Sequence, residues 1–127
     1  MVKILISFCF FSVLLPLAAS ETFIVGTRSN PEKAEVSEID GCYQVVCVIK
    51  DNGKRGKNQD SLNRLKAQKI CLLGIASYRK GKKVSRCSAT VRGMTLQKEP
   101  EKRGEELFFV FTIPIDGVAE KDVQTVQ

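Results

Sequence analysis

Between residues 22 and 50 the apolar and β-branched residues fall in three short segments separated by polar turn residues, a pattern typical of β-strands. Residues 22–25 are β-branched and aromatic, and Ser29-Asn30-Pro31 after them predicts a turn. Residues 34–39 predict a second strand, because the Asp40-Gly41 pair that follows favours a type I′ hairpin turn. Residues 42–50 carry apolar side chains on both faces, which predicts a strand in the centre of a sheet.

A long helix is predicted after the polar, glycine-containing loop 51–57. Asn58, Asp60 and Ser61 offer capping groups for its start, and Gly81 offers a left-handed stop at its end. One stripe at helical spacing is expected to pack on the sheet. It consists of Leu62, Leu65, Leu72, Leu73 and Ala76.

The opposite side of this helix is small or apolar, which is unusual for an exposed surface. Two interpretations stay open, namely cover by a neighbouring segment and a surface for self-association. The residues concerned are Ala67, Cys71, Gly74 and Ile75.

The second half of the chain predicts a β-hairpin. Residues 84–97 form one strand with a bend at Gly93, because the apolar positions move by one residue there. The very apolar segment 107–113 is expected to pair with it. The predicted class is α+β, with an antiparallel or mixed sheet of four to five strands and one amphipathic helix on a face. Residues 21–117 are expected to form a single domain, and residues 118–127 a weakly structured tail.

The first 20 residues have the pattern of a cleaved secretory signal peptide. Lys3 precedes an apolar stretch of limited length, and Ala18-Ala19-Ser20 supplies small residues for cleavage. The stretch is too short to span a bilayer, so no membrane span is expected in the mature protein. The predicted location is therefore secreted or periplasmic.

Charge favours an anionic partner or simple solubility. The full chain carries a net charge of +6, which falls to +5 once Lys3 leaves with the signal. Four cations near the end of the helix and on the next strand are the candidate contact for an anionic partner. They are Lys82, Lys83, Arg86 and Arg92. The phenylalanines fall in core patterns and not beside these cations, which argues against nucleic acid.

The chain has no histidine, which removes the commonest catalytic base and metal ligand. We therefore expect no enzyme activity, no cofactor and no metal. Cys42, Cys47, Cys71 and Cys87 remain after signal cleavage and are candidates for disulfides in an oxidising compartment. Their three pairings stay open, as does the alternative that Cys47 and Cys71 are simply buried.

Gln44-Val45-Val46 resembles the start of the Gln-x-Val-x-Gly protease-binding hairpin of cystatins. The resemblance implies an inhibitory role for Gln44 and Val46. It covers five residues, with Val48 in place of the final glycine, and the predicted helix follows this segment whereas in cystatins it precedes it. No inhibitory site is assigned from it.

These observations predict an exported, non-enzymatic binding or structural module that contacts a protein or an anionic polymer. The alternative is a secreted inhibitor or effector that acts on another organism's enzyme through the charged loop 98–104.

Overall fold

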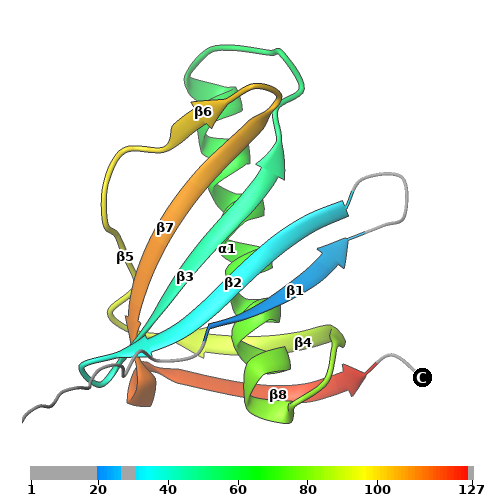
Figure 1. Cartoon of the computed structure of the whole chain (residues 1–127), viewed down its shortest axis with the longest axis vertical. Coiled ribbons are helices and arrows are strands. Elements are labelled where there is room, and N and C mark those ends of the chain that lie inside the picture. Colours follow the sequence, from blue (N-terminus) through cyan, green and yellow to red (C-terminus); the bar gives the residue numbers. More distant parts are fainter. Residues whose placement is uncertain (1–19, 27–30, 126–127) are drawn as a thin grey trace, which may run out of the picture.

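A computed structural model describes residues 20–26 and 31–125. The predicted signal peptide, apart from Ser20, and most of the predicted Ser29-Asn30-Pro31 turn lie outside these residues. Within residues 20–26 and 31–125, eight strands, one α-helix and one 3-10 turn follow each other (Figure 1). They are β1 (Glu21–Gly26), β2 (Pro31–Ile39), β3 (Cys42–Lys50), α1 (Lys57–Lys80), β4 (Val84–Val91), β5 (Thr95–Leu96), β6 (Glu101–Arg103), β7 (Glu106–Pro114), the 3-10 turn (Ile115–Gly117) and β8 (Val118–Thr125).

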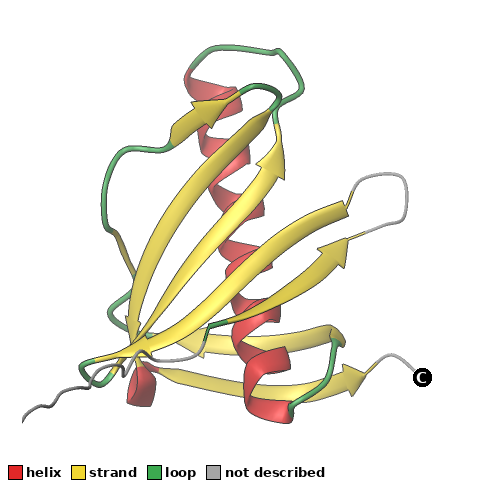
Figure 2. Ribbon diagram, viewed as in Figure 1, coloured by secondary structure: helices red, strands yellow, loops and turns green. Residues whose placement is uncertain are grey.

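The strands form two antiparallel sheets. The larger sheet has the order β1-β2-β3-β7-β5, with β6 also paired to β7, and β4 pairs with β8 in a separate two-stranded ribbon. α1 lies across one face of the larger sheet, and the ribbon crosses the C-terminal part of α1 (Figure 2). The predicted α+β class is confirmed, but the described residues contain more strands than the four to five expected.

The first half of the chain folds as its pattern predicts. Asp40 and Gly41 both have positive φ angles, of 52° and 77°, as a type I′ turn requires. β3 lies between β2 and β7, so it is the central strand that its apolar faces predict. Its residues Tyr43, Val45 and Cys47 are buried beneath α1, in one core with Val36 and Phe111.

The helix ends where the sequence predicts but begins without the predicted cap. Gly81 has a φ angle of 74°, and its N–H donates to the carbonyl oxygen of Ser77. At the other end the N-cap residue is Gly56, and no side chain caps the first turn. The side-chain caps predicted at Asn58, Asp60 and Ser61 are therefore wrong, but Asp60 does lie in the first turn, where a negative charge is favourable.

The prediction of which side of α1 faces the larger sheet is also wrong. Leu62 and Leu65 are 58% and 61% exposed and point away from this sheet. Further along the same stripe, Leu72 and Leu73 are half-buried and Ala76 is fully buried, because the ribbon covers this part of the helix.

The small residues of α1 face the larger sheet. A Cβ atom on Gly74 would lie 2.5 Å from the Cβ of Ala34 in β2, so the helix and the sheet approach as closely as a glycine allows. Dense packing against the sheet explains why this side lacks large residues. The predicted self-association surface is wrong, because all four of its residues belong to the core. These residues are Ala67, Cys71, Gly74 and Ile75.

The chain changes sheets at the predicted bend. β4 does not continue through Gly93 to pair with β7, as the predicted hairpin requires, but pairs with β8. Of residues 84–97, only the two residues of β5, beyond the bend, belong to a strand that pairs with β7. The segment expected to be a weakly structured tail thus contributes strand β8 and completes the ribbon.

Arg79 ties the ribbon to the helix and the larger sheet. Its guanidinium donates to the Tyr43 hydroxyl at 2.7 Å, to the carbonyl oxygens of Ile115 and Val118, and to Glu120 at 3.1 Å. It also lies 5.3 Å from the centre of the Tyr43 ring. Arg79 thus fixes where β8 begins.

The close contact at Gly74 predicts that Gly74→Ala destabilises the protein. Alanine favours a helix over glycine by about 1 kcal/mol, whereas overpacking a core costs about 1–3 kcal/mol. We expect a net loss of stability in urea unfolding, with the slope m unchanged. Ser61→Ala, at an exposed position of the same helix, is the control and should leave the midpoint nearly unchanged. An increased midpoint for Gly74→Ala would contradict the close approach.

Candidate functional site

The predicted contact residues lie on and beside the outer face of the β4–β8 ribbon, the face turned away from α1. Its register places Arg86 opposite Gln124 and Ser88 opposite Lys121, and all four residues are exposed. The other face, with Cys87, packs toward α1, and Arg86 also borders the depression between the ribbon and Leu72 and Leu73 of α1. Despite register shifts on both sides of Arg86, exposure along the two strands separates a basic outer face from a half-buried inner face.

The structure brings the four predicted contact residues to one ribbon. Lys82 and Lys83 precede β4 at one end, Arg86 lies on its outer face, and Arg92 follows its other end, all of them exposed. Within residues 20–26 and 31–125, no ion pair engages any of these four or Lys121. The acidic residue Asp122, also exposed, interrupts the basic face on β8.

Sequence reasoning missed the contribution of Lys121 to this face. Lys121 enters the face only through the pairing of β8 with β4, two strands separated by residues 92–117. The alternation of Val118, Glu120 and the later Val123 is too irregular to predict a strand, and Asp122, with a φ angle of 55°, interrupts it. The hydrophobic pattern near Lys121 therefore does not indicate that this residue belongs to the basic face.

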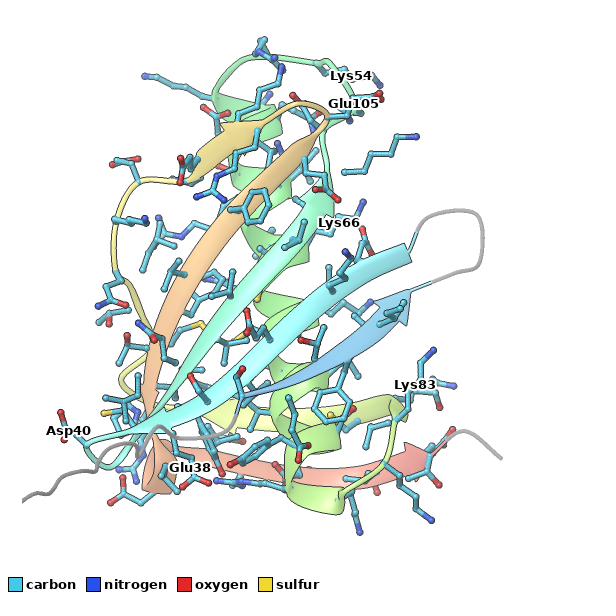
Figure 3. All side chains as sticks on the ribbon, in the orientation of Figure 1. Glu38, Asp40, Lys54, Lys66, Lys83 and Glu105 are labelled. Carbon is cyan, nitrogen blue, oxygen red and sulfur yellow. The ribbon has the colours of Figure 1, made fainter. Side chains whose placement is uncertain are left out.

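A second basic segment, Lys54-Arg55-Gly56-Lys57, lies at the start of α1 and is partly neutralised. Arg55 and Lys102 both contact the Asp51 carboxylate, at 3.3 and 3.0 Å, and the Asp51 side chain is only 3% exposed. The N–H of Gly53 donates to the same carboxylate at 3.0 Å. This hydrogen bond, with Lys102 and Arg55, lowers the pKa of Asp51 to about 2. Lys54 and Lys83 lie at opposite ends of the molecule, so the two basic segments do not form one patch (Figure 3).

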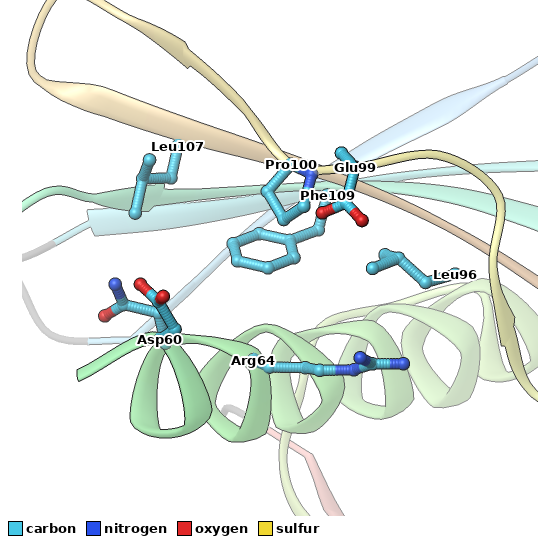
Figure 4. A pocket seen from close by; sticks show the side chains of 8 residues that line it. Asp60, Arg64, Leu96, Glu99, Pro100, Leu107 and Phe109 are labelled. Atoms are coloured by element: carbon cyan, nitrogen blue, oxygen red, sulfur yellow. The ribbon is translucent and has the colours of Figure 1, made fainter. Parts of the chain in front are cut away.

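A cleft of about 370 Å³ opens between the first turns of α1 and the segment that joins β5 to β7 (Figure 4). Phe109, Leu107 and Leu96 give it an apolar lining. Its polar lining comes from the helix and from the connecting segment. These residues are Asp60, Asn63, Arg64 and Glu99.

The carboxylates that line the cleft are not buried. Catalytic acids and bases are usually tuned by burial, and Asp60 and Glu99 are both exposed. Within residues 20–26 and 31–125, no group of three or more metal-ligating side chains lies close enough to hold a metal ion.

The charged segment 98–104 is not a free loop. Its residues 101–103 form β6, which pairs with β7, and Lys102 is bound to Asp51. Arg103 pairs with Glu101 and lies 4.8 Å from the centre of the Phe108 ring. These contacts hold in place the segment expected to act as an inhibitory loop. Gln44 of the cystatin-like sequence lies within β3 and donates to Gln97, so it is part of the sheet.

The four predicted disulfide cysteines are free thiols in this structure. Cys47 in β3 and Cys71 in α1 are fully buried in the same core, as the alternative interpretation of the sequence has it. Burial raises the pKa of Cys47, and its contact with the Cys71 thiol raises it further. Cys42 and Cys87 are half-buried.

Comparisons with family models, with curated proteins and with solved structures give no match for this chain. No helix in the described part of the chain has both the length and the apolar character needed to cross a membrane.

The charge contacts of Asp51 predict an acid-dependent loss of stability. In the unfolded chain an aspartate titrates near about 3.9, and folding lowers the pKa of Asp51 to about 2. The carboxylate therefore favours the folded state above pH 4, and this contribution disappears as the pH falls toward 2. We expect the melting temperature of Asp51→Asn to change less between pH 4 and pH 2 than that of the wild type. Parallel curves would contradict the role of Asp51, and Asp116→Asn, at an exposed position, is the matched control.

Burial also predicts the order in which the thiols react. In the reduced, folded protein, iodoacetamide should modify Cys42 and Cys87 before Cys47 and Cys71, because only the thiolate attacks and it must be accessible. Peptide mass analysis at successive times measures this order. Equal rates at all four sites in native buffer would contradict the burial of the Cys47–Cys71 pair, whereas equal rates in denaturant are expected.

Proposed function

We propose that this protein is an exported, non-enzymatic binding module that contacts an anionic partner through the outer face of the β4–β8 ribbon. The observation that carries the proposal is the cross-strand placement of Arg86 and Lys121 on one exposed face, with Lys82 and Lys83 at one end and Arg92 at the other.

The contrast with three basic residues elsewhere in the protein supports this assignment. Arg79 is turned inward onto Tyr43 and Glu120, and Arg55 and Lys102 neutralise Asp51. Each of these three cations has a carboxylate partner within the protein that offsets part of its charge. The cations of the ribbon have no such partner within the described residues, so their charge is directed to solvent. A concentration of one sign of charge attracts an anionic surface and steers its approach.

A binding role also fits the chemistry of the chain better than catalysis. With no histidine in the sequence, an acid–base site would depend on buried carboxylates or a buried lysine. The carboxylates of the cleft are exposed, and the buried carboxylates Glu32 and Asp51 are each paired with a cation. Export is also part of the proposal, and it is inferred from the predicted signal peptide.

Heparin, as a model polyanion, tests the ribbon. The protein should be retained on heparin resin at low salt and released at higher salt, because exposed charges are screened within about 10 Å at 0.1 M. Lys82→Glu/Lys83→Glu/Arg86→Glu/Arg92→Glu should weaken binding by at least tenfold, since each cation near an anionic surface contributes about 1 kcal/mol.

The matched control changes the same kind of charge elsewhere. Lys33→Glu/Lys50→Glu alters two exposed lysines of the larger sheet. If binding depends on the ribbon, this pair should cause a smaller loss than Arg86→Glu/Arg92→Glu, which changes the net charge equally. Equal losses would mean that net charge alone governs retention and would remove the ribbon as the site.

A further inference from the structure

The outer face of α1 carries an apolar stripe that the ribbon covers only in part. Leu72, Leu73 and Ala76 lie where β4 crosses the helix and are half-buried or buried. Leu62 and Leu65, on earlier turns of the same stripe, are 58% and 61% exposed. The exposed leucines are therefore continuous with an interface that already excludes water.

Cations lie along the helix on both sides of these leucines, although Leu62 also borders a depression lined by Lys50, Lys66, Asp51 and Glu105. From residue 61 to residue 80, α1 contains no carboxylate, and Lys69 lies between Leu65 and Leu72 on the outer face. Lys69 and Arg86 of β4 line one depression with Leu72 and Leu73. At the other end Lys57 begins the helix and is exposed. Two exposed leucines thus lie between cations along the helix axis.

We propose that this face of α1, from Lys57 to Leu72 with Arg86 of the ribbon, docks onto an anionic phospholipid membrane surface. Leu62 and Leu65 would enter the boundary between headgroups and acyl chains, while Lys57, Lys69 and Arg86 contact the headgroup phosphates. Surface-bound helices combine apolar burial with attraction to anionic lipids in this way. Lysine side chains suit this position because their stems can lie along apolar surface while the ammonium reaches the headgroups.

Charge argues against a second copy of this chain as the occupant. Antiparallel pairing of two such helices would bring Lys69 of each copy to a surface without any carboxylate from residue 61 onward. An anionic membrane instead supplies both the apolar layer for the leucines and the negative charge for the cations. This inference rests on the proposed function in one respect, namely that the partner is anionic. Arg86 belongs both to the outer face of the ribbon and to this face of α1.

Vesicle binding tests the proposal with the exported protein, whose N-terminus is first identified by mass. The wild type should sediment with vesicles of equal parts phosphatidylglycerol and phosphatidylcholine, and much less with phosphatidylcholine alone. Leu62→Ser/Leu65→Ser should weaken this binding on the order of tenfold or more, since each leucine loses its apolar burial. Lys69→Glu should weaken it as well, and more at low salt than at high salt.

The controls separate this surface from the heparin site and from general effects. Ile39→Ser changes another exposed apolar residue, 46% exposed at the end of β2, and should leave vesicle binding unchanged. The Leu62→Ser/Leu65→Ser variant should still be retained on heparin. Vesicle sedimentation therefore tests the membrane surface, and heparin retention tests the ribbon separately. All variants carry the same N-terminus, and circular dichroism should show the same fold.

Three results would overturn the inference. One is wild-type protein that stays in solution with the anionic vesicles, and another is full vesicle binding by the leucine variant. The third is a stable dimer of the wild type that becomes monomeric in Leu62→Ser/Leu65→Ser, because a second copy would then cover the leucines.

Discussion

The contact between Gly74 of α1 and Ala34 of β2 decides how the rest of the molecule is arranged. Only the side of the helix that lacks large residues can approach the sheet this closely. The leucine side must then face away, where it needs a second cover. The β4–β8 ribbon supplies this cover over the C-terminal half of the helix, so the existence of a separate ribbon follows from the packing on the other side.

The parts of the fold that depend on local pattern could be predicted from the sequence. The Asp40-Gly41 turn, the central position of β3 and the end of α1 at Gly81 all have signals within a few residues. The orientation of α1 could not be predicted in this way, because both of its sides are apolar. The two sides differ in the size of their residues, and only the side with small residues fits closely against the sheet. The shape of that sheet surface is known only once the strands have paired.

The pairing of β4 illustrates the same limit. Residues 84–97 do contain a bend at Gly93, but the sequence does not tell whether the chain continues in one sheet or leaves it. The partner strand β8 has a weak pattern and gains stability by pairing. Of the candidate site, Lys82, Lys83, Arg86 and Arg92 were identified from sequence as cations on one exposed strand face and its ends, whereas Lys121 depends on long-range register. The sequence pattern predicts that Leu62 is buried, but Leu62 is exposed. The prediction fails because the sequence does not tell which apolar side of α1 faces the sheet.

Two-stranded ribbons are at best marginally stable by themselves. The β4–β8 ribbon is held by Arg79 and by the N–H of Val84, which donates to the Ser77 hydroxyl at the end of α1. Local opening of this last helical turn would therefore release the ribbon while the larger sheet stays folded, since the sheet makes its own strand pairs. Such a partly open molecule would keep most of its amide protection and lose its basic face, so binding activity and global stability need not decline together.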